Sequence, residues 1–418
     1  MAIIDNDKHL LGELALPLPA PNRPVPGYVE QHPKVWWVAV KQLLQQLSQQ
    51  FPDHTPQALA IDGTSSTLLL CDADGEPLHP ALMYNDSRAI KQAEILSKIA
   101  PTDSPVISAS SSLAKALYLA GQFPSQGQAH LMHQADWLLG KLSGEPGVSD
   151  DNNCLKLGYD TINGCWPEWL EQLPIPQQWL PKVSPPGTTV GLISPRIANE
   201  LNLPPQLKLV AGTTDSTAAT LAAGISQIGE AVTSLGSTLV LKVLSDRPVF
   251  AAEYGVYSHR IGDLWLVGGA SNSGGAVLKQ YFSDEQIQAY SQRVNPNKPT
   301  GLNYYPLPSM GERFPINDPQ LQPRLTPRPA SDPLFFQGIL EGIAQIECEG
   351  YARLSELGAP AANQIWSIGG GTANRGWLEI REKLLGCPIQ AAPHQQAAYG
   401  AALLAHHYNR KKMCYSSS

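Results

Sequence analysis

The chain has 418 residues, 43% of them hydrophobic, which is enough for two domains that each bury a core. The formal net charge of −7, with no Lys/Arg run before residues 410–412, argues against a nucleic-acid-binding protein. The six scattered cysteines lack a CxxC pair, and the chain has neither an apolar leader nor a long apolar run, so we expect a cytoplasmic protein without structural zinc, disulfides or membrane segments.

Strand and helix patterns alternate through the N-terminal half. The expected strands are short apolar runs bounded by turns, and the expected helices carry apolar residues at helical spacing. They are strands at 2–4, 10–16, 59–61 and 67–71, and helices at 35–50, 112–122 and 130–142. A proline-rich stretch at 174–187 and the pair Pro204-Pro205 predict a domain boundary near Pro204. We therefore expect one domain at residues 1–204 and a second at 205–418.

Two polar segments of this half are candidate ligand sites. The strand at 59–61 runs into Asp62-Gly63-Thr64-Ser65, a polar strand end of the kind that binds ligands in α/β folds, although an ordinary hairpin has the same pattern. Asn85 and Arg88 follow the next strand-like run, where they suit either a polyol or a helix N-terminus with local salt bridges. His130 and His133 share a helix face in this interpretation, but no third ligand accompanies them, so no metal site is predicted.

The segment at 207–244 is the strongest candidate for chemistry. An apolar strand ends at Gly212, and Asp215 follows at the start of a small-residue helix, where a carboxylate serves either as a helix cap or as a catalytic base. Two β-rich runs then flank Gly236-Ser237-Thr238, which is either a simple tight turn or a hairpin that faces a phosphate.

Glycine-rich strand ends recur later in the chain. The segment at 268–275 leads into a helix, and Gly369-Gly370-Gly371 follows a buried-type strand at 365–368. Three consecutive glycines let a flat ligand lie against the backbone. Asn374 and Trp377 follow at once and are candidates to hydrogen-bond and to pack beside such a ligand.

These segments together resemble the FGGY family of carbohydrate kinases over nearly the whole chain. The segments similar to the family's C-terminal lobe are GTTDSTAA (212–219), GEAVTSLGST (229–238), GGASNSGGA (268–276), GGGTANRGW (369–377) and AAYGAA (397–402). Those similar to its N-terminal lobe are IDGTSSTLLLCDADG (61–75), YNDSRA (84–89) and DDNNCLKLGYD (150–160). The IDGTS sequence, in place of the usual xylulokinase Gln-Met-His-Gly pattern, resembles the D-ribulose kinase, or xylulose-kinase-like, branch.

The resemblance implies a fold, an activity and a set of site residues. The implied fold is a two-lobed α/β, actin-like ATPase (ribonuclease H-like) fold with the active site in the interlobe cleft. The implied activity uses ATP and Mg²⁺ to phosphorylate the terminal hydroxyl of a ketopentose, D-ribulose before D-xylulose. Asp215 corresponds to the general base at the sugar, Ser65 to a sugar-binding position, and Asn85 and Arg88 to further sugar contacts. The implied ATP-binding residues are Gly236, Ser237, Thr238, Gly275, Gly370, Gly371, Thr372, Ala373, Asn374 and Trp377.

The chain departs from the family pattern at its start. Family members open with a strand that carries an Asp-x-Gly-Thr-Ser phosphate motif, whereas Met1 falls where the second strand is expected. Without that first strand, a neighbouring strand should expose unpaired backbone groups. Some of the groups that bind the phosphate would also be missing, and the loss of one such group commonly lowers the rate by about 10²–10³. Either the protein is longer than this sequence, or its activity is weakened or lost. A catalytically silent sugar- or nucleotide-binding protein is therefore an alternative, and an actin-like ATPase with a protein client is a third.

Overall fold

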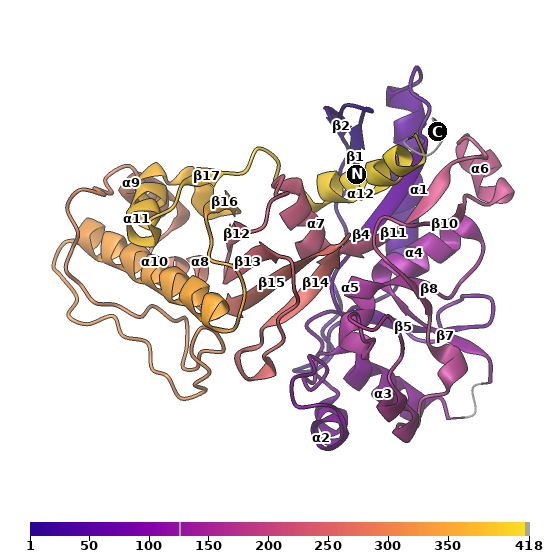
Figure 1. Cartoon of the computed structure of the whole chain (residues 1–418), viewed down its shortest axis with the longest axis horizontal. Helices are drawn as coiled ribbons and strands as arrows, with labels where there is room; N and C mark the ends of the chain where they lie inside the picture. The colour runs from indigo at the N-terminus through magenta and orange to yellow at the C-terminus, as the bar shows by residue number, and fades with distance from the viewer. Residues whose placement is uncertain (125–126, 414–418) are drawn as a thin grey trace. The chain divides into compact units, whose positions relative to one another are not determined.

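The computed structural model of the chain describes residues 1–124 and 127–413, with side chains described up to residue 406. The chain divides into two compact units, whose elements are labelled in Figure 1. Unit 1 is Met1–Ala222 together with the segment that begins at Gln396, and unit 2 is Ala223–Gln395. This division differs from the expected boundary at Pro204, because the strand that follows Pro204 pairs within unit 1 and the C-terminal helix packs there as well.

Unit 1 is an α/β structure built from short sheets. Its strands are β1 (Ala2–Ile4), β2 (Leu10–Glu13), β3 (Glu30–Gln31), β4 (Ala58–Gly63), β5 (Leu68–Asp72), β6 (Ala81–Leu82), β7 (Ala129–His133), β8 (Val148–Asp150), β9 (Lys182–Ser184), β10 (Thr189–Leu192) and β11 (Lys208–Thr214). Its helices are α1 (Lys34–Gln50), α2 (Ile90–Ile99), α3 (Ser112–Gln122), α4 (Gln134–Ser143), α5 (Asp151–Cys154), α6 (Pro195–Leu201), α7 (Asp215–Ala222) and α12 (Ala397–Met413). The strands and helices predicted before residue 123 are confirmed, with ends that differ by up to three residues.

The helix predicted at 130–142 is wrong in its first turn. Residues 129–133 form β7, which pairs antiparallel with β5 so that His133 lies opposite Leu68. Helix α4 begins only at Gln134, and His133 caps it, since its side chain and that of Asp136 each bond to the other's backbone N–H. Pairing across the sheet therefore overrides the local helical pattern.

The parallel pair β4–β11 forms the centre of unit 1. Ala60 lies opposite Val210 and Asp62 opposite Thr213, so both strands end at the same edge of the sheet. The two backbones approach so closely at Gly212 that a Cβ there would overlap the carbonyl oxygen of Ile61. Helix α12 packs on α7 in the same way, since a Cβ at Gly400 would overlap the carbonyl oxygen of Ala218.

Two strands of unit 1 have a free edge. Among the described residues, β1 pairs only with β2, and β4 pairs only with β11. The side chains of Leu59 and Ile61 in β4 are half-buried, whereas Leu209 and Val210 in the neighbouring β11 are fully buried. This pattern agrees with the unpaired backbone expected from the sequence.

Unit 2 is a mixed sheet covered by helices. The six strands, in the order β14-β15-β13-β12-β16-β17, are β12 (Glu230–Leu235), β13 (Leu239–Ser245), β14 (Tyr257–Ile261), β15 (Leu264–Ser271), β16 (Gln364–Ile368) and β17 (Ile389–Ala391). The helices are α8 (Gly275–Tyr281), α9 (Asp284–Ser291), α10 (Asp332–Glu356) and α11 (Arg375–Leu385). None of the helices described in either unit has the length and apolar character needed to cross a bilayer.

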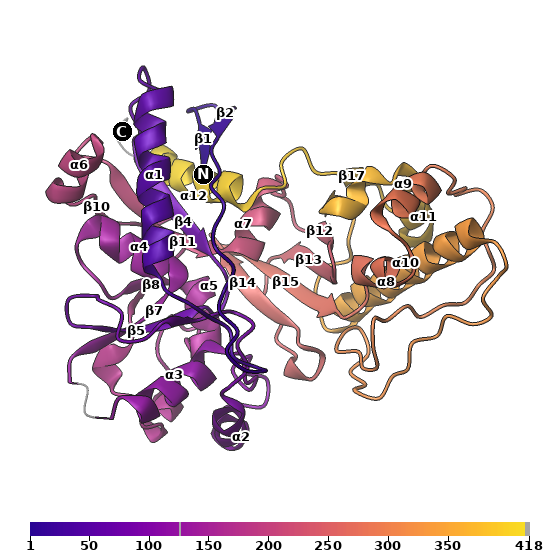
Figure 2. The ribbon, with the colours of Figure 1, turned by 180° about the vertical axis from the view of Figure 1, so that it is seen from behind.

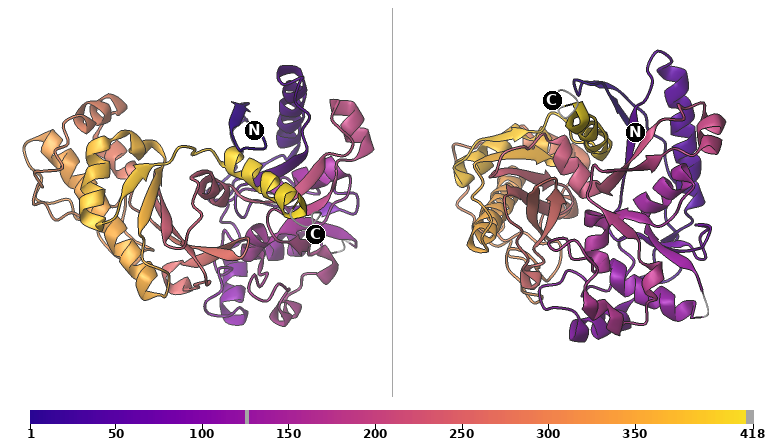
Figure 3. Two further views of the ribbon diagram at one scale, coloured as in Figure 1. Left: turned by 45° about the horizontal axis from the view of Figure 1, so that its top comes forward. Right: turned by 45° about the vertical axis from the view of Figure 1, so that its right-hand side comes forward.

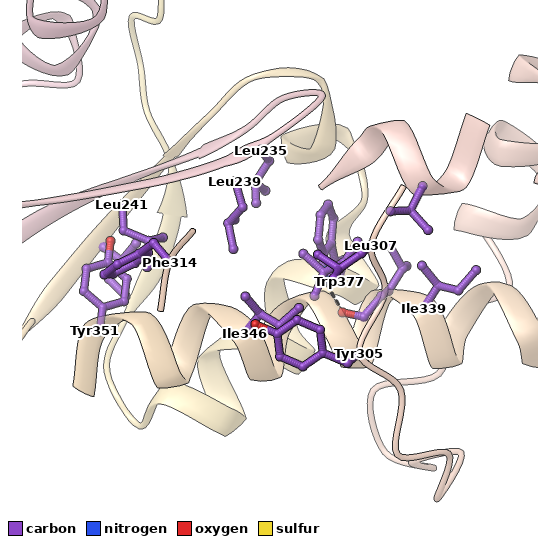
Figure 4. Close-up of a cluster of buried hydrophobic side chains, with 14 of the residues drawn as sticks. Leu235, Leu239, Leu241, Tyr305, Leu307, Phe314, Ile339, Ile346, Tyr351 and Trp377 are labelled. Atoms are coloured by element: carbon purple, nitrogen blue, oxygen red, sulfur yellow. Dashed lines mark hydrogen bonds between the residues drawn. The ribbon is translucent and has the colours of Figure 1, made fainter. Parts of the chain in front are cut away.

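The core of unit 2 lies between the sheet and α10. Figure 4 shows Leu235 and Leu241 of the sheet together with Phe314 from a loop and Ile346 and Tyr351 of α10. This burial positions the turns at the ends of β12 and β16, because both strands are anchored by apolar side chains along their length.

A charged network lies within this same core. Arg381 of α11 donates from Nε to Glu347 Oε2 (2.5 Å) and from Nη2 to Oε1 (2.6 Å), and its Nη1 donates to Ser367 Oγ (2.8 Å). Both charged side chains are fully buried, so their hydrogen bonds offset the cost of removing the charges from water.

Candidate functional site

Two carboxylates meet at the carboxyl ends of β4 and β11. Asp215 is the first residue of α7, directly after β11, and its Oδ1 accepts a hydrogen bond from the N–H of Ser216 (2.6 Å). Asp62 is the penultimate residue of β4, and β4 is the strand parallel to β11. Burial and, to a smaller extent, the neighbouring charge of Asp215 together raise the pKa of Asp62 to about 6. A pair of interacting carboxylates at one strand edge is a common arrangement in sites that bind and move protons.

Sequence reasoning did not select Asp62 as a site residue. The Asp-Gly-Thr-Ser pattern was visible, but its place beside Asp215 depends on the parallel pairing of two strands that lie about 150 residues apart in the chain. The signal that could have found it is the acid at the end of an apolar strand.

Buried polar side chains hold the carboxyl end of β11 in place through hydrogen bonds. Asn152 donates from Nδ2 to Thr213 Oγ1 (2.9 Å), which ties α5 to the end of β11. Asp150 caps α5 by accepting the N–H groups of Asn152 and Asn153, both at 2.9 Å. Burial raises the pKa of Asp150 to about 8, and the charge of Asp136 acts in the same direction. The DDNN segment therefore positions the end of β11.

The predicted sugar-binding residue Ser65 lies in the half-buried turn after β4. The next residue, Ser66, is buried with φ +64°, and Lys115 Nζ donates both to its carbonyl oxygen and to that of Met83, each at 2.7 Å. Burial lowers the pKa of Lys115 to about 7. Lys115 thus connects the Ser65 turn to the segment that carries Asn85. The sequence did not identify this role, although a lysine among the apolar residues of α3 is a signal for it.

The other two predicted sugar contacts lie in different environments. The side chain of Asn85 is exposed. That of Arg88 is 2% exposed and pairs with the carboxylates of Asp86 (Nη2 to Oδ2, 2.6 Å) and Glu30 (Nη1 to Oε1, 2.7 Å). The structure therefore shows the local salt bridges that were the alternative interpretation of Arg88. The guanidinium group of Arg88 orders the loop at 84–88.

In unit 2, three of the predicted glycine-rich segments come together. The turn between β12 and β13 carries the exposed hydroxyl groups of Ser237 and Thr238. The carbonyl oxygen of Gly236 accepts the N–H of Gly275 (2.8 Å) at the start of α8. A Cβ at Gly369 would lie 2.9 Å from the carbonyl oxygen of Leu235, so the third segment adjoins the same turn.

The residues after Gly369 form a short 3-10 turn, Gly370–Ala373. Gly370 and Ala373 are exposed, while Gly371 and Thr372 are half-buried. Thr372 Oγ1 donates to the carbonyl oxygen of Gly369 (2.8 Å), which closes the turn. This surface beside the β12–β13 turn leaves its backbone open to a flat ligand.

Two predicted nucleotide contacts lie in the core instead. The indole of Trp377 is 3% exposed, packs among the apolar side chains shown in Figure 4, and donates from Nε1 to the carbonyl oxygen of Leu340 (3.0 Å). Asn374 is buried as the N-cap of α11, where its Oδ1 accepts the N–H of Trp377 (3.0 Å). Both side chains are therefore engaged within unit 2, and the Trp377 ring lies against Gly371, so a contact of either residue with a nucleotide stays a prediction.

A separate group of possible metal ligands lies in the turn between β1 and β2. One ligand atom from each of Asp5, Asp7 and His9 lies within 4.8 Å of the others. The Asp5 carboxylate already accepts the N–H groups of Asp7 (2.8 Å) and His9 (2.9 Å), so it stabilises the turn. By contrast, the carboxylate oxygens of Asp62 and Asp215 are donors of the type that Mg²⁺ prefers, and they adjoin the candidate site.

Comparison with known proteins agrees with this organisation. Residues 1–222 match the N-terminal domain and residues 231–408 the C-terminal domain of the FGGY family of carbohydrate kinases. The xylulose kinase of Staphylococcus xylosus is 23% identical over 403 residues, which cover 91% of this chain and 83% of that protein. The xylulose kinase of Bacillus subtilis (strain 168) is 25% identical over 405 residues, covering 91% and 80%.

Solved structures show the same fold. A xyloylose kinase from Brucella ovis superposes with a TM-score of 0.87 at 23% identity and covers 98% of this chain and 88% of that one. A ligand-bound xylulose kinase from Lactobacillus acidophilus gives 0.86 at 18% identity, with 98% and 87% covered. The predicted α/β, actin-like ATPase fold is thereby confirmed, and the chain belongs to the FGGY family of carbohydrate kinases, a family of ATP-dependent sugar kinases.

Proposed function

We propose that the chain transfers the γ-phosphoryl group of ATP to the terminal hydroxyl of a ketopentose, with D-ribulose as the preferred substrate and D-ribulose 5-phosphate as the product. The observation that carries the proposal is the pair Asp62 and Asp215 at the ends of two adjacent parallel strands. Phosphoryl transfer needs a group that accepts the proton of the attacking hydroxyl, together with donors that hold the phosphate oxygens.

In this proposal Asp215 is the general base. Its Oδ1 accepts a hydrogen bond from the N–H of Ser216, which helps to fix the carboxylate at the start of α7. Asp62, whose pKa burial raises to about 6, carries a negative charge at neutral pH beside Asp215. Ser65 and Asn85 supply the polar contacts to the remaining sugar hydroxyls.

The nucleotide residues of the proposal lie in unit 2. The exposed hydroxyl groups of Ser237 and Thr238 are donors for phosphate oxygens, and the turn at 370–373 offers its backbone to the base or ribose. Mg²⁺ bound with ATP would neutralise phosphate charge during transfer.

D-Xylulose is the second candidate substrate. Several similar proteins carry the name xylulose kinase, which favours D-xylulose, whereas the Thr64-Ser65 sequence in place of the xylulokinase pattern favours D-ribulose. The two sugars differ in the configuration of one hydroxyl group. A site that hydrogen-bonds this hydroxyl can therefore discriminate between them by a large factor.

The test is a coupled ADP-release assay of the purified chain with Mg·ATP and D-ribulose, D-xylulose, L-ribulose or glycerol, each corrected for the rate without sugar. We expect the highest kcat/KM with D-ribulose. A higher value with D-xylulose would select the second candidate. Saturable sugar binding in calorimetry without turnover for any sugar would reject the kinase and favour a silent binding protein.

A further inference from the structure

A single buried carboxylate joins a long loop of unit 2 to one end of its sheet. Figures 2 and 3 show this loop, residues 292–331, in orange between α9 and α10. Glu312 lies within it and is 2% exposed. Its Oε2 accepts the hydroxyl of Ser271 (2.6 Å), the last residue of β15, and its Oε1 accepts the N–H of Asn272 (2.7 Å). The carboxylate therefore meets the chain where β15 ends.

Two further donors bond to Glu312. The N–H of Arg313 donates to Oε1 (2.9 Å), and Tyr305 donates from its hydroxyl to Oε2 (3.3 Å). Burial and the Glu312 charge raise the pKa of Tyr305, so this hydroxyl keeps its proton. Four donors fit an ionised carboxylate, because in that form both of its oxygens only accept hydrogen bonds.

Ser271 connects this carboxylate to the turn between β12 and β13. Its Oγ also accepts the N–H of Ser273 (2.9 Å), and the carbonyl oxygen of Ser273 accepts the N–H of Leu239 (2.7 Å). Leu239 is the first residue of β13 and directly follows the Gly236-Ser237-Thr238 turn. Consecutive hydrogen bonds therefore run from Glu312 to the end of the turn that is predicted to face a phosphate.

The start of α8 lies against the same turn. Gly275 and Ala276 donate their N–H groups to carbonyl oxygens of the turn, at 2.8 and 3.1 Å. Gly274 has φ +146°, and a Cβ there would lie 2.6 Å from the carbonyl oxygen of Ser237. The path of residues 271–276 therefore sets the position of the turn.

Apolar packing already attaches this loop to the sheet. Phe314, two residues after Glu312, is fully buried, and a Cβ at Gly269 of β15 would lie 2.7 Å from its ring. Removing a carboxylate from water costs free energy that its hydrogen bonds must offset. Unlike apolar contacts, these bonds are directional, so they specify one path of the backbone at the end of β15.

We propose that Glu312 is a positioning residue for ATP: through Ser271 it holds residues 271–276, and with them the turn at 236–238, in the geometry that binds phosphate. The inference rests on the proposed nucleotide site at this turn. Glu312 acts on the turn and does not itself touch the nucleotide. Its loss should therefore weaken ATP binding and leave the sugar contacts proposed in unit 1 unchanged, because only the phosphate donors are displaced.

Calorimetry of Mg·ATP binding to the whole chain, without sugar, tests the proposal. Glu312→Ala should raise the Kd for Mg·ATP by up to about 100-fold, the range expected when hydrogen bonds to a charged group are lost. Glu312→Gln should raise it by about tenfold, because the amide keeps one acceptor oxygen for the four donors. The KM for the sugar should stay within about twofold.

Glu341→Gln is the matched control, because Glu341 anchors another part of the same loop. Glu341 lies half-buried on α10, and its two oxygens share the N–H of Thr300, each at 3.1 Å. Its Oε1 also accepts a hydrogen bond from Gln337 Nε2 (2.9 Å). The control removes the same charge without contact to residues 271–276, so the Kd for Mg·ATP should not change.

Ser271→Ala breaks the same connection by a smaller change. It should also raise the Kd for Mg·ATP by about tenfold, since the added hydroxyl bonds to Glu312 and to Ser273 are both lost. The double variant Ser271→Ala/Glu312→Gln should bind no more than about twofold more weakly than the weaker single variant, because both changes act through the same bonds.

Hydrogen exchange of the nucleotide-free chain gives a readout that depends neither on ATP binding nor on turnover. Glu312→Gln should speed exchange by at least about fivefold at residues 236–239 and 273–277, where the connected N–H groups lie. Exchange in β16, residues 364–368 of the same sheet, should not change.

Three results would overturn the role of Glu312. They are an unchanged Kd in Glu312→Gln, an equal rise of the Kd in Glu341→Gln, and faster exchange throughout the sheet, which is the result of a general loss of stability. An unmodified chain that binds no Mg·ATP would overturn the proposed nucleotide site, and with it the role in ATP binding. Exchange at 236–239 shows separately whether Glu312 holds the turn, so the two failures are distinguishable.

Discussion

Asp62 and Asp215 lie at the carboxyl ends of two adjacent parallel strands, and the charge of Asp215 contributes to raising the pKa of Asp62 to about 6. The two carboxylates come from separate segments of the chain, so their interaction is a property of the β4–β11 pairing. This pair leads to the first two predictions.

Asp215→Asn should lower kcat by about 10²–10⁴, the usual contribution of a positioned general base, with little change in the KM for ATP. Steady-state kinetics with the best ketopentose measure both quantities. Asp103→Asn, which removes an exposed carboxylate of the same unit, is the matched control. Unimpaired turnover in Asp215→Asn would remove this residue from the mechanism.

Asp62 should make the chain less stable as the pH rises from 4 to 7. Its folded-state pKa of about 6 lies above the ordinary aspartate value of 3.8, so the folded chain holds the proton more tightly than the unfolded chain. The stabilisation that protonated Asp62 contributes is thus fully present below about pH 4 and is lost as the pH rises through 6. In the unmodified chain the free energy of unfolding should fall by up to about 2 kcal/mol between pH 4 and pH 7, after allowance for partial exposure of Asp62. In Asp62→Asn this fall should be absent. Urea unfolding of both proteins across this pH range is the measurement, and parallel pH profiles would contradict the shift.

The double change Ser237→Ala and Thr238→Ala should raise the KM for ATP by about 10–100-fold. Hydrogen bonds to charged groups contribute roughly 1.5–3 kcal/mol, and the two hydroxyls are exposed at the β12–β13 turn. Ser309→Ala, an exposed hydroxyl elsewhere in unit 2, should leave the KM unchanged. An unaltered KM in the double variant would show that the nucleotide does not use these hydroxyls.

Gly212→Ala should destabilise unit 1 by about 1–3 kcal/mol or more, because the added Cβ would overlap the carbonyl oxygen of Ile61 and force β4 and β11 apart. Gly191→Ala is the control, since a Cβ at that position in β10 meets nothing within 4 Å. Thermal unfolding followed by circular dichroism compares the two variants. Equal midpoints would mean that the strands are not in such close contact.

Arg381→Met should destabilise unit 2 by about 3–5 kcal/mol, because it leaves the Glu347 carboxylate charged and buried without its partner. Adding Glu347→Leu should recover part of this loss. Lys279→Met breaks an exposed ion pair with Asp284 and should change the free energy of unfolding by less than about 1 kcal/mol. Denaturant unfolding gives all three values, and a small effect of Arg381→Met would contradict a structural role for the network.

Local sequence patterns predicted most of the elements that carry the candidate site. The strand before Asp215, the turn at 236–238 and the strand before Gly369 were all identified from short apolar runs followed by glycine and hydroxyl residues. The helix at 35–50 was equally clear. These features depend on neighbouring residues, so they can be inferred without knowing what packs against them.

Other features depended on partners far along the chain. Residues 129–133 look helical but form a strand because β5 pairs with them, and Lys115 acquires its role only when the Ser66 and Met83 carbonyls meet it. Trp377 has the composition of a ligand contact but lies in the core, since α10 covers its ring. Pairing and burial between distant segments have no local signature in the sequence.

The sequence by itself determined the order of the strands and helices, the FGGY resemblance and the choice of Asp215, because each of these depends on residue type and spacing along the chain. Only the tertiary structure decided that Asp62 is the neighbour of Asp215 and that the unit boundary follows Ala222. The physical reason is that backbone hydrogen bonds and apolar burial join segments by their position in space, and these contacts are formed only when the chain has folded.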